Sequence, residues 1–277
     1  MKKIALVTSC GFGARAREVS EQLFAHGYEV IAVNEKEYEP ESQTAQITFE
    51  QVDYNSKESI DALLERLQVY KLSAVVNCHD TLAFVGDNLR HDFHDFDYLD
   101  FAKVINYNLV SIAAICVGLK DNIEKGGCIV NITSSAAKEG GFVTIAYNAS
   151  KAAVENMSKS LANNFGLYNG IRVNCVAPGW IPKSSEVAAF GTRALADSMT
   201  PVAPIGQNKD LAKAVIDLIN NSSINGSTVV VDGGISSSYL PYMLESSLER
   251  GDETVDSVMS ILTELIGKES NKNSKKN

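Results

Sequence analysis

Short apolar runs alternate with helical patterns along most of the chain. The first run, Lys3–Thr8, is almost continuously apolar, as is typical of a strand buried on both faces. The other predicted strands are Glu29–Val33, Ile47–Val52, Ala74–Asn77, Cys128–Ile132, Arg172–Ala177 and Ser227–Val231. Strands that alternate with helices predict an α/β fold built on a doubly wound parallel sheet, with helices on both faces.

Apolar residues at helical spacing fill the segments between these strands. The predicted helices are Ala14–His26, which Gly27 ends, Ser59–Val69, Phe101–Leu119, Tyr147–Phe165 and Asp210–Ile219. Phe101–Leu119 is apolar on most sides, so we expect it to be buried or to lie at a subunit contact.

The alternating pattern predicts one domain over residues 1–235 and a C-terminal extension over residues 236–267. Within the extension, Thr254–Ile266 has apolar residues at helical spacing, which predicts an amphipathic helix whose apolar face needs a partner. Residues 268–277 (KESNKNSKKN) have nothing to bury and are predicted to be disordered.

Composition and charge narrow the classes of function. The 277 residues carry a formal net charge of −9, which phosphate backbones and anionic lipids repel, so neither nucleic acid nor membrane is expected as a partner. The apolar run Ile4–Val7 is too short for a signal-peptide core, and the chain has no apolar run of the roughly 18 residues that a bilayer span needs. Five cysteines without paired spacing predict a reduced, cytoplasmic protein, and no metal site is expected.

Tyr147 and Lys151 lie four residues apart in a predicted helix, so their side chains share one face. An ammonium beside a phenol favours the phenolate and lowers the pKa of the phenol from its ordinary value of about 10. The pair has the composition of a tuned acid/base, although a surface tyrosine beside a solvated lysine has the same spacing. Ser134 follows the strand Cys128–Ile132 at the ligand edge of a parallel sheet, where its hydroxyl can polarise a carbonyl or cap a turn.

Four motifs in this order resemble the short-chain dehydrogenase/reductase family, in its compact single-domain branch. They are IVNITSS (Ile129–Ser135), YNASK (Tyr147–Lys151), VNCVAPGWI (Val173–Ile181) and VVDGG (Val230–Gly234). The resemblance covers about residues 3–235. It implies a Rossmann-like sheet and hydride transfer with NAD or NADP, which interconverts a ketone and a secondary alcohol.

The resemblance assigns a role to each matching residue. Tyr147 is the general acid/base, Lys151 tunes it and holds the nicotinamide ribose, and Ser134 binds the substrate oxygen. Asn108 matches the helix asparagine that holds a proton-relay water, although a helix-packing amide is the alternative. The implied partners are a small carbonyl or alcohol substrate and further copies of the chain, in a homodimer or homotetramer. Residues 184–204 match the family's substrate loop.

The glycine-rich loop departs from the family pattern Thr-Gly-x-x-x-Gly-x-Gly. Thr8 and Gly13 match, whereas Ser9 and Arg15 replace two glycines. A glycine admits the close approach of backbone and cofactor, so Arg15 is the larger departure. Gly11 and Gly13 still form a looser Gly-x-Gly-x-x-Ala before a helix N-terminus, and we expect Ser9, Gly11 and Gly13 to bind the cofactor in an altered loop.

A second departure follows the strand Ala74–Asn77. The family's Asn-Asn-Ala-Gly reads Asn-Cys-His-Asp here, which retains Asn77 as a cofactor-binding residue but places His79 and Asp80 where small residues flank the cofactor. These two side chains either reshape the pocket wall or add polar groups for the substrate, and a lone histidine is more often structural.

Three more residues complete the predicted cofactor site. Asp53 matches the residue at the adenine edge, and Ile181 matches the residue that packs on the nicotinamide ring. Asn34 stands where NAD-preferring members carry Asp. Glu35 would repel the 2′-phosphate of NADP, whereas Lys36 or Arg15 would attract it, so the prediction leans only slightly to NAD.

Two classes of function remain open from the sequence. The set Ser134, Tyr147, Lys151 and Asn108 favours an NAD(P)-dependent oxidoreductase. The altered loop and the segment from Asn77 to Asp80 favour a redox-silent protein on the same fold. Such a protein would sense a cofactor, bind a partner, or use Ser134 and Tyr147 without hydride transfer.

Overall fold

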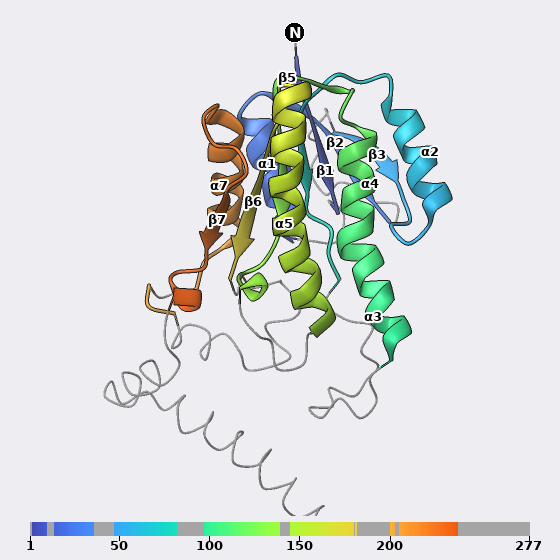
Figure 1. Ribbon diagram of the computed structural model, residues 1–277. Helices are drawn as coiled ribbons and strands as arrows, with labels where there is room; N and C mark the ends of the chain where they lie inside the picture. Colours follow the sequence, from blue (N-terminus) through green and yellow to red (C-terminus); the bar gives the residue numbers. More distant parts are fainter. Residues whose placement is uncertain are drawn as a thin grey trace, which may run out of the picture. The chain divides into compact units, whose positions relative to one another are not determined.

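The computed structural model describes residues 2–9, 14–35, 47–81, 97–138, 145–179, 181, 200–202 and 205–237. Within them, seven strands form one parallel sheet in the order β3-β2-β1-β4-β5-β6-β7 (Figure 1). The strands are β1 (Lys3–Thr8), β2 (Tyr28–Asn34), β3 (Ile47–Gln51), β4 (Leu72–Asn77), β5 (Ile123–Ile132), β6 (Arg172–Pro178) and β7 (Thr228–Val231). The predicted α/β fold with a doubly wound parallel sheet is confirmed.

Two compact units divide the chain, Met1–Gly179 with Gln207–Val231, and Trp180–Gly206 with Asp232–Asn277. The whole sheet and its helices belong to the first unit. The short helix η3 (Ile235–Ser237) belongs to the second. The predicted substrate loop, the helix Thr254–Ile266 and the tail 268–277 lie outside the described residues.

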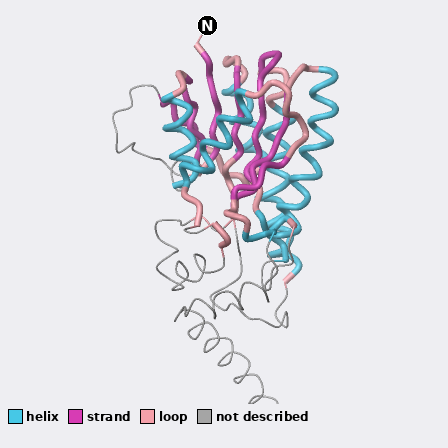
Figure 2. Tube along the Cα trace, turned by 90° about the vertical axis from the view of Figure 1, so that its left-hand side faces the viewer, coloured by secondary structure: helices cyan, strands magenta, loops and turns pink. Residues whose placement is uncertain are grey.

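Helices cover both faces of the sheet (Figure 2). On one face α1 (Ala14–Ala25) packs against α7 (Asn208–Asn220). The other face carries α2 (Lys57–Leu67), α4 (Ser111–Gly118) and α5 (Ile145–Tyr168), whose inner side chains form the main core with the strands. As predicted, α1 ends at a glycine, because Gly27 has a φ of 82° that L side chains rarely adopt.

The predicted helix Phe101–Leu119 is present but not uniform. It consists of α3 (Tyr98–Ile105), a π-helical turn η1 (Asn106–Val110) and α4. Single π turns inside helices are rare and occur often at functional sites. Asn108 lies in this turn and is fully buried.

The same helical stretch, Tyr98–Gly118, has the length and apolar composition that crossing a membrane requires, and within the described residues no other helix does. Its inner face is part of the core, because Tyr107, Ile112 and Ile115 are buried against the sheet. Burial in this core therefore accounts for much of its apolar composition.

Candidate active site

The predicted catalytic residues gather where β1, β4 and β5 end. In an open parallel sheet, ligands bind outside the carboxyl ends of the strands, at the point where the strand order reverses. Here that point lies between β1 and β4, which pair through Val7 and Val76. Ser134 follows β5, and the buried Tyr147 and Lys151 project from the first turns of α5.

Asp80 is the centre of the polar contacts at this edge. Its Oδ2 lies 3.1 Å from Lys151 Nζ and accepts a hydrogen bond from the Tyr147 hydroxyl at 3.3 Å. Its Oδ1 lies 3.1 Å from Arg15 Nη2. Lys151 Nζ also donates to the carbonyl oxygen of Ile132 at 3.0 Å. Arg15, Asp80 and Lys151 thus form one ionic cluster against the phenol.

The expectation that Lys151 lowers the pKa of Tyr147 stays a prediction, and the structure adds other groups that act on the phenol. Burial raises the pKa of the phenol above its ordinary value, and the negative charge of Asp80 raises it further. Arg15 and a side-chain hydrogen bond with Ser134 act in the opposite direction but are weaker. Burial also lowers the pKa of Lys151, against the opposing effect of Asp80. Lys151 therefore pairs mainly with Asp80 in this structure.

Ser134 has two contacts that bear on its predicted role. Its Oγ accepts a hydrogen bond from the Ala136 backbone N–H at 3.2 Å and caps the short helix η2 (Ser135–Ala137). Its side chain also interacts with the phenol of Tyr147. The capping alternative and the proximity to Tyr147 are therefore both present.

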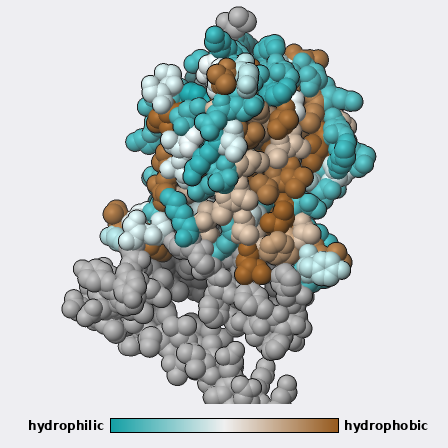
Figure 3. All heavy atoms as spheres, in the orientation of Figure 1, coloured by the Kyte–Doolittle hydropathy of each residue, from teal (hydrophilic) through white to brown (hydrophobic). Residues whose placement is uncertain are grey.

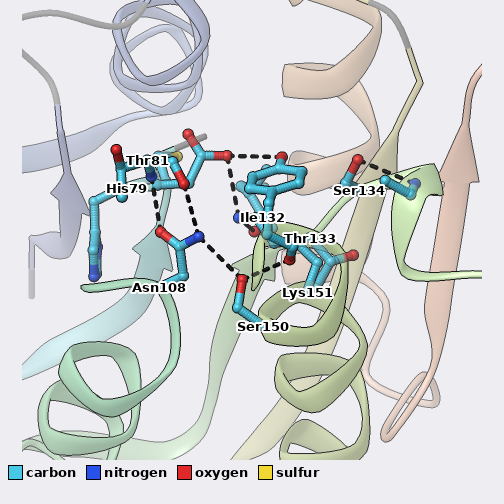
Figure 4. Close-up of polar contacts among 12 residues, drawn as sticks. His79, Thr81, Asn108, Ile132, Thr133, Ser134, Ser150 and Lys151 are labelled. Carbon is cyan, nitrogen blue, oxygen red and sulfur yellow. Dashed lines mark hydrogen bonds and ion pairs between the residues drawn. The ribbon is translucent and has the colours of Figure 1, made fainter. Parts of the chain in front are cut away.

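Asn108 connects three elements through its side-chain amide. Its Oδ1 accepts from Thr81 N–H at 2.8 Å, and its Nδ2 donates to Thr81 C=O at 2.9 Å and to Ser150 Oγ at 3.0 Å (Figure 4). Ser150 in turn donates to the Tyr147 carbonyl at 2.6 Å. The amide thus holds the loop that carries Asp80 against the helix that carries Tyr147 and Lys151.

His79 is completely buried, and both ring nitrogens have partners. Nδ1 lies 2.8 Å from Thr8 Oγ1, and Nε2 lies 2.8 Å from Ser111 Oγ. The Ser111 hydroxyl donates to the carbonyl oxygen of Tyr107, so it accepts from His79, and the Nε2–H tautomer follows. Burial lowers the pKa of His79 to about 3, so the ring is neutral at physiological pH. These contacts favour the structural interpretation of His79.

The start of the altered loop is held by the same group of residues. Tyr54 stacks on His79 with ring centroids 3.9 Å apart, and its hydroxyl accepts from the Ser9 N–H at 3.2 Å. Ser9 has a φ of 65°, a left-handed conformation that costs a non-glycine residue about 1 kcal/mol. Ser9 thus replaces a glycine while keeping a glycine-like backbone. Gly11 and Gly13 lie outside the described residues.

A groove of about 610 Å³ is lined by the last residues of β3, by residues that follow β2 and β3, and by two residues of α2. Glu35, Glu50, Asp53 and Arg66 are its charged lining residues. Arg66 donates to Glu50 Oε2 at 2.7 Å, and Tyr107 donates its phenolic hydrogen to Glu35 Oε2 at 2.9 Å. The groove therefore presents more negative than positive charge.

The remaining predicted cofactor residues lie on separate elements of the structure. Asn34 ends β2 and is buried, and Asp53 Oδ1 accepts from the Asn55 N–H at 2.8 Å in the turn before α2. Asn77 donates to Asn131 Oδ1 at 2.8 Å, and its own Oδ1 is a buried acceptor without a hydrogen-bond partner among the described residues. Ile181 belongs to the second compact unit.

The ion pair of Arg15 with Asp80 was not foreseen from the sequence. Both residues were recognised as departures from family glycines, and their charges are opposite. Each follows one of two neighbouring strands, β1 and β4. Opposite charges at two glycine positions that follow neighbouring strands are therefore the sequence feature that indicates a direct contact.

Comparisons with known proteins agree with this fold. The family described as enoyl-(acyl carrier protein) reductase matches residues 13–236. The 3-oxoacyl-[acyl-carrier-protein] reductase FabG of Haemophilus influenzae is 32% identical over 244 residues, which cover 84% of this chain and 98% of the relative.

Solved structures of other proteins share this fold. A 4-hydroxyisoleucine dehydrogenase complexed with NADH superposes with a TM-score of 0.74 at 25% identity, over 86% of this chain and 100% of that one. BdcA in complex with NADPH has a TM-score of 0.70 at 21% identity, over 83% of this chain and 93% of that one, and supports the fold alone. With a family match over most of its length, the chain belongs to the short-chain dehydrogenase/reductase family of oxidoreductases.

Proposed function

We propose that this oxidoreductase uses NAD or NADP to interconvert a ketone and a secondary alcohol. The observation that carries the proposal is the grouping of Ser134, Tyr147 and Lys151 at the carboxyl edge of the sheet, with Asn108 bracing their framework. A buried phenol whose hydrogen is already directed to an acceptor is suited to proton transfer.

The described residues fit a dinucleotide. An ammonium has three N–H donors, and among the described residues two from Lys151 reach Ile132 and Asp80, which leaves one for a ribose hydroxyl. Asp53 and Glu35 line the groove that would hold the adenosine end. When bound, the dinucleotide supplies or accepts the hydride.

The protein side chains would then handle the proton. Tyr147 donates its phenolic proton to the carbonyl oxygen during reduction and takes it back during oxidation. Ser134 donates a hydrogen bond to the same oxygen and stabilises the negative charge that develops there. Asn108 acts by fixing the loop after β4 against α5.

A direct assay tests this proposal. Because the Haemophilus relative is named a 3-oxoacyl-[acyl-carrier-protein] reductase, acetoacetyl-CoA is the first probe, followed by simple ketones and secondary alcohols. We expect ketone-dependent loss of nicotinamide absorbance from NADH or NADPH. Absence of turnover with every probe, despite cofactor binding, would count against the proposed reaction.

We also propose that NAD is preferred over NADP. Glu35 would face the additional phosphate of NADP with a like charge, and Arg66 is already paired with Glu50. Glu35→Gln keeps an acceptor for Tyr107 but removes the charge. We expect the variant to bind NADPH about fivefold more tightly, from a Coulomb term of about 1 kcal/mol between close like charges in water, with little change for NADH. Unchanged or weaker NADPH binding would contradict the assignment.

A redox-silent role is the second candidate, and a specific observation favours it. Asp80 already engages Lys151 and Tyr147, the groups that the proposed reaction needs. A redox-silent protein would not bind a nicotinamide dinucleotide, or would bind it but turn over no carbonyl or alcohol substrate.

We further propose that the chain forms a homodimer or homotetramer through α4 and α5. Val110 and Val117 lie seven residues apart on one helical face and are about half exposed, at 51% and 49%. Figure 3 shows apolar surface on the side that carries these helices. We expect Val117→Glu to shift the protein toward monomer in light scattering at micromolar concentration. A monomer-sized species for the unmodified protein would contradict the proposal.

A further inference from the structure

Two positions at which the chain departs from its family's glycines meet in space. Arg15 lies in α1 and Asp80 follows β4, and Arg15 Nη2 is 3.1 Å from Asp80 Oδ1. The side chains are only 14% and 6% exposed. Charges this deep lose most of their hydration, so a pair of them persists only where further polar partners are present.

The further partners of Asp80 are the two proton-transfer groups of the proposed reaction. Oδ2 lies 3.1 Å from Lys151 Nζ and 3.3 Å from the Tyr147 hydroxyl, which donates to it. One anion thus lies between two cations, with Arg15 on one oxygen and Lys151 on the other. The phenol shares the second oxygen with Lys151.

The backbone on both sides of Asp80 is fixed. His79 is held through both ring nitrogens and by stacking on Tyr54. Thr81 is held through its N–H and its C=O by the amide of Asn108. The carboxylate therefore projects from a braced segment, which favours a defined role for Asp80 over an incidental surface contact.

We propose that Asp80 is a positioning residue that holds Tyr147 as the neutral, proton-donating phenol, with Arg15 as its counter-ion. This inference rests on the proposed function for its catalytic meaning. In ketone reduction the Tyr147 O–H bond breaks and its proton moves to the carbonyl oxygen, while the carbonyl carbon receives the hydride from NADH or NADPH. Water then restores the phenol. Oxidation takes the phenolate as its base, and the carboxylate opposes that form, so the phenolate forms only at a higher pH than it would without Asp80.

The charges around the phenol bear on its protonation state. Among the described residues, the charged groups that face Tyr147 are Asp80 from the loop after β4, Arg15 from α1 and Lys151 from its own helix. Burial and Asp80 both raise the pKa of Tyr147, and Arg15 lowers it. Removing the carboxylate would take away the anion that raises the pKa of the phenol and leave Arg15, which lowers it.

The test is a proton titration of Tyr147 that needs neither substrate nor cofactor. The full chain is labelled with ¹³Cζ-tyrosine, and the Tyr147 resonance is identified by its loss in Tyr147→Phe. We expect Asp80→Asn to shift the ionisation of Tyr147 about 1–3 pH units lower than in the unmodified protein. Asp61→Asn, an exposed carboxylate in α2, is the control and should leave the resonance unchanged. Ionisation at the same or a higher pH in Asp80→Asn overturns the proposal.

A second variant serves if Asp80→Asn does not fold, and a pH–rate profile provides an independent measurement. Asp80→Gly restores the family residue, so it serves if Asp80→Asn does not fold, and the same shift is expected. If acetoacetyl-CoA is reduced, the alkaline limb of the pH–rate profile should move lower by the same interval. If Asp80 has only a structural role, the variant will have a lower rate but an alkaline limb at the same pH as the unmodified protein. That result overturns the proposal. If nothing is reduced, the proposed function fails, while the resonance still decides the role of Asp80.

Discussion

Replacing Tyr147 with Phe should lower the turnover number for ketone reduction by about 10²–10⁴-fold, the usual contribution of a proton-transfer group. The substitution removes only the hydroxyl, and Tyr147 is 7% exposed, so the ring still fills its site. Cofactor affinity should stay nearly unchanged, because the hydroxyl contacts Asp80 and Ser134. Steady-state kinetics and a separate cofactor titration measure the two effects.

Matched variants isolate this effect. Tyr168→Phe removes a hydroxyl from the exposed far end of α5 and should leave turnover unchanged. Lys151→Ala should weaken both turnover and cofactor binding, because its third N–H is the donor proposed for the ribose. Turnover of Tyr147→Phe within a few-fold of the unmodified protein would rule out the proton-transfer role.

Acid should destabilise the protein through His79, by about 2 kcal/mol at pH 5. The pKa of the buried ring is about 3, against an ordinary value of 6.5. Above pH 6.5 the ring is neutral in both the folded and the unfolded chain, and stability is complete. As pH falls below 6.5, the unfolded chain takes up a proton that the folded chain cannot accept, so stability falls until about pH 3.

Urea unfolding at several pH values measures this loss. His79→Gln keeps a donor and an acceptor but cannot titrate, so its free energy of unfolding should fall less steeply between pH 7 and pH 5. The comparison of slopes is independent of any constant loss of stability that the substitution itself causes. Equal slopes for the two proteins would show that His79 is not the group responsible.

The sheet was predictable because parallel strands are buried on both faces. Lys3–Thr8, for example, is apolar from Ile4 to Val7 without interruption. β5 was predicted only from Cys128, whereas it begins at Ile123. Residues 124–126 are exposed, two glycines precede Cys128, and the pairing with β4 shifts register there, so no apolar pattern marks this part of the strand. The π turn Asn106–Val110 was not predicted, because nothing in the sequence pattern distinguishes a single π turn from the α-helix on either side.

The candidate site was predictable residue by residue but not in its contacts. Tyr147 and Lys151 were expected to interact because they share a helical face. Helical spacing says nothing about a third group, and Asp80 joins them from a loop 67 residues before Tyr147. The neutral state of His79 likewise depends on burial and on two hydroxyls, Thr8 and Ser111, from other elements.

The central claim is that this oxidoreductase binds a nicotinamide dinucleotide although Arg15 and Asp80 replace family glycines. Titrating the unmodified protein with NADH and with NADPH, followed by nicotinamide fluorescence, tests it most directly. The account predicts saturable binding of both, with NADH the tighter ligand because Glu35 and Asp53 line the groove. No binding of either dinucleotide up to millimolar concentration would contradict it and favour the redox-silent alternative.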